Sequence, residues 1–130
     1  MIGWFKRMQL VLVLVLLGIV LVGCSKENKP PEWIDDAVIY EVNIRQYTKE
    51  GTFEAFREHL PRLKEMGVDV LWFMPIHPIS KTKRLGSLGS YYSISNYLEV
   101  NPEFGTKEDF KRLVDEAHEM GFKVMMDWVA

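Results

Sequence analysis

Two kinds of side chain in this sequence could contact a ligand. Asp127 lies at the end of the apolar stretch 122–127. At the end of a barrel strand such a carboxylate points toward an active-site mouth, but it could equally accept hydrogen bonds from local backbone amides. Tyr91 and Tyr92 could stack on the apolar face of a sugar ring while their hydroxyls bond its oxygens, or they could simply pack within their own loop.

The histidines do not form a metal-binding pattern. His59 and His118 fall in two separate predicted helices, and His77 falls in a loop. We therefore expect no metal site in this chain, and structural or solvated roles for these side chains. His77 is the one histidine that could approach a substrate.

The elements that must position these residues form an internal repeat, whose two copies lie 54 positions apart in the sequence. Thr52 matches Thr106, and Glu-Met-Gly at 65–67 matches the same triplet at 119–121. Each copy predicts a helix that is capped by threonine, ends at glycine and runs directly into an apolar strand. This is the αβ half of a βαβ unit, whose strands pair in parallel.

The predicted order is strand, helix, strand, long loop, helix, strand. The strands are expected at 37–44, 68–73 and 122–128, and the helices from Phe53, with an interruption at Pro61, and from Thr106. The loop 74–102 is longer than most connections in compact domains, and its tyrosines favour a functional role over disorder.

Consecutive βαβ units build either a barrel or a doubly wound sheet. A doubly wound nucleotide site would carry several glycines in the first strand-to-helix turn, whereas residues 45–51 contain one. A long loop after the second strand is typical of barrel enzymes. We therefore predict an α/β fold, in which residues 33–130 form the first three strands and two helices of an incomplete (β/α)8 TIM barrel.

The N-terminus predicts export. Lys6 and Arg7 precede an apolar run over 10–22, which at 13 residues is shorter than the roughly 20 that span a bilayer. A secretory signal over 1–23 is favoured over a transmembrane anchor. Residues 24–32, rich in polar residues and proline, should form a tether.

Charge excludes one class of partner. The formal net charge of −2 becomes −4 without Lys6 and Arg7, which argues against nucleic acid and weakly favours a neutral partner. The one tight cluster of cations lies in a Gly/Ser-rich loop, where we expect it to be solvated rather than to cradle phosphate: Lys81, Lys83 and Arg84.

Several ordered segments carry a family resemblance. Residues 38–42 (Val-Ile-Tyr-Glu-Val) and 71–76 (Leu-Trp-Phe-Met-Pro-Ile) resemble the opening strands of the α-amylase family of glycoside hydrolases. Residues 89–106 resemble its loop between strand two and helix two, and 127–130 (Asp-Trp-Val-Ala) resemble the start of its strand-three motif. Leu-Val-Gly-Cys at 21–24 resembles a bacterial lipobox, in which Cys24 would be lipidated.

The resemblance implies roles for particular residues. Tyr92 matches the tyrosine that stacks on the sugar at the cleavage subsite, and Asp127 matches a supporting aspartate that is not the nucleophile. The family's catalytic carboxylates would lie downstream of Ala130, so no catalytic residue is expected in this chain. Calcium, bound by many members, is an expectation for the full-length protein only. Ser93 and Asn96 stand where many members have Asp, and Tyr91 replaces a common Gly.

These observations predict the N-terminal fragment of an exported, membrane-anchored lipoprotein. The complete enzyme would act with a retaining mechanism on α-glucosidic bonds of starch-like glucans or malto-oligosaccharides, and the fragment alone would be inactive. Two alternatives are open: an exported sugar-binding lipoprotein, and an inactive truncated gene product.

Overall fold

The computed structural model describes residues 3–4, 7–9 and 29–129, and the chain divides into two compact units at Ile34 and Asp35. In the first unit, Glu32–Ile34 form one turn of 3-10 helix, η1. Most of the predicted signal sequence, and Cys24 with it, lie outside the described residues. Within the described part of the chain, no helix is long and apolar enough to cross a membrane.

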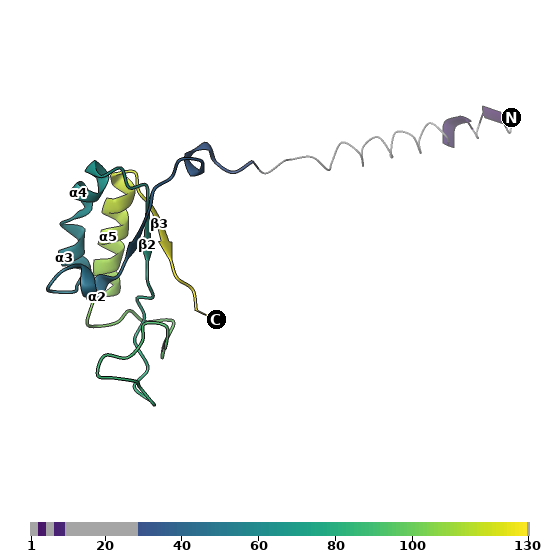
Figure 1. Ribbon diagram of the computed structural model, residues 1–130. Coiled ribbons are helices and arrows are strands. Elements are labelled where there is room, and N and C mark those ends of the chain that lie inside the picture. Colours follow the sequence, from purple (N-terminus) through teal and green to yellow (C-terminus); the bar gives the residue numbers. More distant parts are fainter. Residues whose placement is uncertain (1–2, 5–6, 10–28, 130) are drawn as a thin grey trace. The chain divides into compact units, whose positions relative to one another are not determined.

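The second unit contains a three-stranded parallel sheet (Figure 1). Its strands are β1 (Ile39–Val42), β2 (Val70–Phe73) and β3 (Lys123–Met126), in the spatial order β1-β2-β3. All three predicted strands are confirmed, but each is shorter than predicted. Before β2, for example, the backbone N–H of Val68 bonds to the carbonyl of Leu63 at the end of the preceding helix, so this residue belongs to the turn.

Four helices accompany the sheet: α2 (Ile44–Tyr47), α3 (Phe53–Arg57), α4 (Leu60–Glu65) and α5 (Lys107–Glu119). The helix predicted from Phe53 is interrupted near Pro61, as predicted, and forms the two helices α3 and α4. Proline has no backbone N–H to donate, and Pro61 is accommodated in the first turn of α4, where that donor is not needed. The short α2 was not predicted.

The repeated module forms as its sequence indicates. The Thr52 hydroxyl accepts a backbone N–H from the first turn of α3, and Thr106 forms a reciprocal capping box with Asp109 at the start of α5. Gly67 and Gly121 follow α4 and α5 at φ of +79° and +85°, a conformation that disfavours other residues. Local chemistry therefore fixes where α3 and α5 begin and where each copy turns into its strand.

The helices cover one face of the sheet (Figure 1). Phe73 lies at the centre of this layer, fully buried, with its ring centroid 5.6 Å from those of both Phe56 in α3 and Phe110 in α5. Leu71, two residues earlier on the same face, is also fully buried. The hydrophobic core therefore lies between β2 and the two helices of the repeat.

The opposite face of the sheet is not covered by the described residues. Glu41, Trp72 and Met125 lie side by side in register across this face. Met125 is 41% exposed, and Ile39, two residues before Glu41, is 55% exposed. The strand order follows the chain without reversal, as in the first part of a barrel, where this face would be the interior.

Candidate functional site

Asp127 is held by three hydrogen bonds at the carboxyl edge of the sheet. It directly follows β3, and its backbone N–H donates to the carbonyl of Phe73 at 2.9 Å. Its Oδ1 accepts the indole Nε1–H of Trp72 at 2.6 Å, and its Oδ2 accepts the hydroxyl of Tyr92 at 2.7 Å. The structure thus brings together Asp127 and Tyr92, which the sequence had marked separately, and adds Trp72.

Strand geometry explains why Trp72 reaches this carboxylate. Successive side chains in a strand point to opposite faces, so with Leu71 and Phe73 buried against the helices, Trp72 projects from the other face. Phe73 pairs with Met126, so Asp127 is the next residue along the neighbouring strand. The same alternation, read from the sequence, could have identified Trp72 as a site residue.

Tyr92 presents a phenol that stays neutral and a ring that remains accessible. The hydrogen bond to Asp127 raises the pKa of Tyr92 above its ordinary value, with smaller contributions from burial and from the charges of Asp127 and Glu41. The side chain is 46% exposed. Because the hydroxyl is engaged by the carboxylate, the aromatic face is the part of Tyr92 that is open to a ligand.

Tyr91 has a different environment from its neighbour. The Arg45 guanidinium lies over its ring, 4.6 Å from the centroid, and also forms an ion pair with Glu103 at 3.0 Å. Tyr91 is half-buried and packs against the core. Of the two interpretations of this tyrosine pair, packing within the loop therefore applies to Tyr91 and exposure to Tyr92.

A second aromatic group lies beside Asp127 in the chain. The ring of Trp128 is 5.4 Å from that of Tyr97, which in turn is 5.7 Å from the ring of His77. Trp128 and Tyr97 are both exposed. This row of rings was not predicted, because it joins residues from distant parts of the sequence.

His77 lies at the inner end of this row and is 8% exposed. Its Nδ1 is 2.8 Å from the carbonyl oxygen of Glu99, so Nδ1 is the donor. Its Nε2 is buried and has no hydrogen-bond partner among the described residues. The structure therefore places His77 behind Tyr97 rather than on the open edge, and its contact with a substrate stays a prediction.

The two other histidines do not converge on this site, whereas the charge of Glu41 acts on Tyr92. Among the described residues no group of three His, Cys, Asp or Glu side chains could hold a metal ion. His59 precedes α4 without a side-chain cap hydrogen bond and packs its ring edge-on to Tyr47, and His118 is exposed on α5. Glu41 lies within β1 on the uncovered face. Asp127 already accepts two side-chain hydrogen bonds, which suits a positioning role better than nucleophilic attack.

Comparison with known proteins identifies the family. Residues 26–130 match the family described as "Alpha amylase, catalytic domain". The chain is 35% identical over 127 residues to an alpha-glucosidase of Apis mellifera, covering 94% of this chain and 21% of that protein. It is 41% identical over 104 residues to a trehalose synthase of Thermus thermophilus, covering 76% of this chain and 10% of that protein.

The fold comparison agrees with the sequence comparison. An alpha-amylase from Lactobacillus plantarum superposes with a TM-score of 0.70 at 48% identity, over 72% of this chain and 22% of that one. The chain thus spans about a fifth or less of the length of these relatives. With its parallel strands, its repeated αβ module and a match over residues 26–130, the chain belongs to the alpha-amylase catalytic-domain family.

Proposed function

We propose that this chain forms the first part of a glycoside hydrolase that cleaves α-glucosidic bonds in starch-like glucans or maltodextrins. The observation that carries the proposal is the joining of Trp72, Asp127 and Tyr92 at the carboxyl edge of the sheet, where barrel enzymes bind their substrates. Relatives described as alpha-glucosidase and alpha-amylase support this class of bond.

Each residue then has a defined task. The exposed ring of Tyr92 stacks on a glucose ring, and Asp127 fixes the tyrosine's orientation through the hydroxyl. His77 supports the same edge from behind Tyr97. A retaining mechanism needs two carboxyl groups about 5–5.5 Å apart across the scissile bond, and we place these beyond Ala130.

Calcium does not fit the residues that the structure describes. Calcium takes about six to eight oxygen ligands, largely carboxylates and carbonyls. Within residues 29–129 no three His, Cys, Asp or Glu side chains form a group that could hold a metal ion, and both side-chain oxygens of Asp127 already accept hydrogen bonds. We therefore assign no step to calcium through these residues.

The substrate role of Tyr92 is tested by Tyr92→Ala in the full-length gene product. Release of reducing ends from maltoheptaose should fall at least tenfold in kcat/KM, because the sugar loses its aromatic platform. Leu98→Ala, an exposed residue in the same loop, is the matched control and should change the rate less than twofold. Full activity of Tyr92→Ala, with an unchanged circular dichroism spectrum, would contradict the assignment.

We also propose that the protein is exported and anchored to the membrane by lipid on Cys24, after removal of residues 1–23. The sequence motif Leu-Val-Gly-Cys supports this. Two acyl chains would hold the protein at a membrane surface at roughly 0.8 kcal/mol per buried methylene. Labelling of cells with radioactive palmitate should mark the wild type and not Cys24→Ser, and label retained by the variant would refute lipidation at this site.

The alternatives differ from the enzyme in turnover. A sugar-binding lipoprotein would bind maltoheptaose without cleaving it, and a truncated gene product would do neither. Membership of a catalytic-domain family favours the enzyme. Binding and cleavage of maltoheptaose, both measured on the full-length gene product, together decide between the three.

A further inference from the structure

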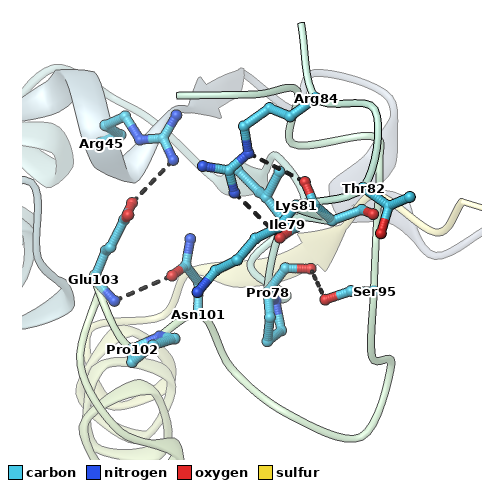
Figure 2. A pocket seen from close by; sticks show the side chains of 11 residues that line it. Arg45, Pro78, Ile79, Lys81, Thr82, Arg84, Ser95, Asn101, Pro102 and Glu103 are labelled. Carbon is cyan, nitrogen blue, oxygen red and sulfur yellow. Dashed lines mark hydrogen bonds and ion pairs between the residues drawn. The ribbon is translucent and has the colours of Figure 1, made fainter. Parts of the chain in front are cut away.

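One cavity among the described residues lies away from Tyr92 and Asp127. It has a volume of about 450 Å³ and lies between the segment after β1, the segment after β2 and the turn before α5 (Figure 2). Arg45 lines it from the first segment, Lys81 and Arg84 from the second, and Asn101 and Glu103 from the third. Its volume is in the range of small-molecule sites, which is about 300–1,000 Å³.

Arg84 is fixed in place at this cavity by backbone carbonyls. Its Nε donates to the carbonyl of Ser80 at 3.1 Å, its Nη1 to Ser87 at 3.1 Å and its Nη2 to Ile79 at 3.3 Å. Gly89 permits this close packing, because a Cβ there would come within 2.9 Å of Nε. A guanidinium has five N–H donors, so two of them remain available.

The positive charge of Arg84 is oriented but not neutralised. Carbonyl groups carry no net charge, and within residues 29–129 no carboxylate forms an ion pair with Arg84 or Lys81. The sequence contains no Asp or Glu anywhere from Val70 to Leu98. Glu103 is already paired with Arg45. The cavity therefore keeps about two uncompensated positive charges beside one neutral ion pair.

Asn101 adds a further donor. It is 5% exposed, and its Oδ1 accepts the backbone N–H of Glu103 at 3.1 Å. Figure 2 shows the amide nitrogen on the other side of this group, pointing toward the part of the cavity that holds the two guanidinium groups. With its oxygen turned to the backbone of Glu103, this amide presents its N–H donors to the cavity.

We propose that this cavity binds a small phosphorylated molecule, with the phosphate on Arg84, Lys81 and the Asn101 amide. A phosphate group carries about −1.5 to −2 charges at neutral pH, which matches the two uncompensated cations. Arginine donates to phosphate oxygens in a fork of parallel N–H bonds, and Arg84 is already oriented by its carbonyl partners.

This inference departs from the expectation that Lys81, Lys83 and Arg84 are merely solvated. Lys81 and Lys83 are both exposed, as that expectation has it, and of the two only Lys81 lines this cavity. The expectation is wrong for Arg84, whose side chain folds back onto its own loop. The difference arises because loop closure, which composition does not reveal, sets the direction of each side chain.

Isothermal titration calorimetry of the full-length gene product tests the site with inorganic phosphate, glucose 6-phosphate and glucose. Phosphate and glucose 6-phosphate should bind, and glucose should bind at least tenfold more weakly to the cavity than glucose 6-phosphate. Equal affinities for the two anions would show that the phosphate group alone accounts for binding. Tighter binding of glucose 6-phosphate than of inorganic phosphate would show that the ligand of the cavity is a sugar phosphate. No binding of either anion, or equal affinity for glucose, overturns the proposal.

Variants locate the binding within the chain. Arg84→Gln should weaken phosphate at least tenfold and Lys81→Gln several-fold, while Lys49→Gln, which removes an exposed cation outside the cavity, should have no effect. Because Arg84→Gln also removes hydrogen bonds that hold the loop, Arg84→Lys provides a second test. It keeps the positive charge, loses the paired N–H donors of the guanidinium, and should also weaken phosphate binding. Unchanged affinity in Lys81→Gln and Arg84→Lys would overturn the assignment.

The site is independent of the proposed glycosidase activity, because binding is measured without turnover. Tyr92→Ala should leave phosphate affinity unchanged, since Tyr92 does not line the cavity. Loss of phosphate binding in Tyr92→Ala would place the anion at the sheet edge instead and refute the inference. Loss of maltoheptaose cleavage with phosphate binding intact would concern only the proposed glycosidase site.

Discussion

The two side-chain hydrogen bonds to Asp127 allow the loss of kcat/KM to be predicted for variants that lack either donor. Trp72→Phe and Tyr92→Phe each keep an aromatic ring and remove one donor from the same carboxylate. A hydrogen bond to a charged group contributes about 1.5–3 kcal/mol, and the partial exposure of Tyr92 places its bond at the lower end. Since about 1.4 kcal/mol is tenfold, we expect each variant to lose about tenfold in kcat/KM on maltoheptaose.

The double variant should lose more than the sum of the single losses. With one donor removed, the other still orients the carboxylate, whereas with both removed it is held only through its backbone N–H. Residues that share a partner show coupling free energies of about 0.5–3 kcal/mol in double-mutant cycles. Tyr97→Phe is the matched control, because it removes a hydroxyl with no hydrogen bond among the described residues and retains the ring against Trp128.

The assay is the initial rate of reducing-end release by the full-length gene product and its variants at several maltoheptaose concentrations. A fall in kcat/KM of less than twofold in each single variant would show that the orientation of Asp127 does not depend on these donors. Additivity within about 0.5 kcal/mol would show that they act independently. Either result would refute the view that one carboxylate links Trp72 to Tyr92.

Four further predictions follow from the fold and the pKa shift. Phe73→Ala should lower the free energy of unfolding of the full-length protein by about 3–5 kcal/mol in urea denaturation, because it leaves a cavity at the centre of the core. Leu98→Ala, at an exposed position, should change this free energy by less than about 0.5 kcal/mol. Thr106→Ala should cost about 1 kcal/mol in the same measurement through loss of the cap of α5, and no change would mean that the capping box contributes nothing to stability. The pKa of Tyr92 is raised, so its hydrogen bond stabilises the fold below about pH 10 and is lost above the raised pKa. Ultraviolet titration of the wild type, compared with Tyr92→Phe, should show one tyrosine that ionises at unusually high pH. In Asp127→Asn the pKa of this tyrosine should return toward its ordinary value. Residues 25–130 alone should not unfold cooperatively on heating, because one face of the sheet is open, and a sharp calorimetric transition would contradict this.

The boundaries of the repeated module were predictable because they are local. A threonine that caps the helix three residues before its backbone partner, and a glycine that accepts a positive φ, act within a single turn of chain. The buried faces of the helices were predictable for the same reason, since apolar residues recur at helical spacing, as Phe53, Phe56 and Leu60 do in one copy and Phe110, Leu113 and Ala117 in the other. The interruption at Pro61 was predictable because proline lacks a backbone N–H, whereas the short α2 was not predicted.

The site was only partly predictable. The sequence marked Tyr92 and Asp127 through the resemblance and through their places in the predicted elements. It did not join them, because 35 residues separate the tyrosine from the aspartate and 55 separate Trp72 from it. Contacts over such separations depend on strand register, and a one-residue slip would turn Trp72 toward the helices.

By itself, then, the sequence determined the class of fold, the repeated αβ unit and the residues at the ends of its strands. Each of these depends on hydrophobic period, caps and turns within a few residues of one another. Only the tertiary structure decided which donors meet Asp127, which tyrosine is open, and that Arg84 folds back onto the carbonyls of its own loop beside a cavity. Those outcomes depend on loop closure and sheet pairing, which bring distant residues together and do not produce a periodic pattern in the sequence.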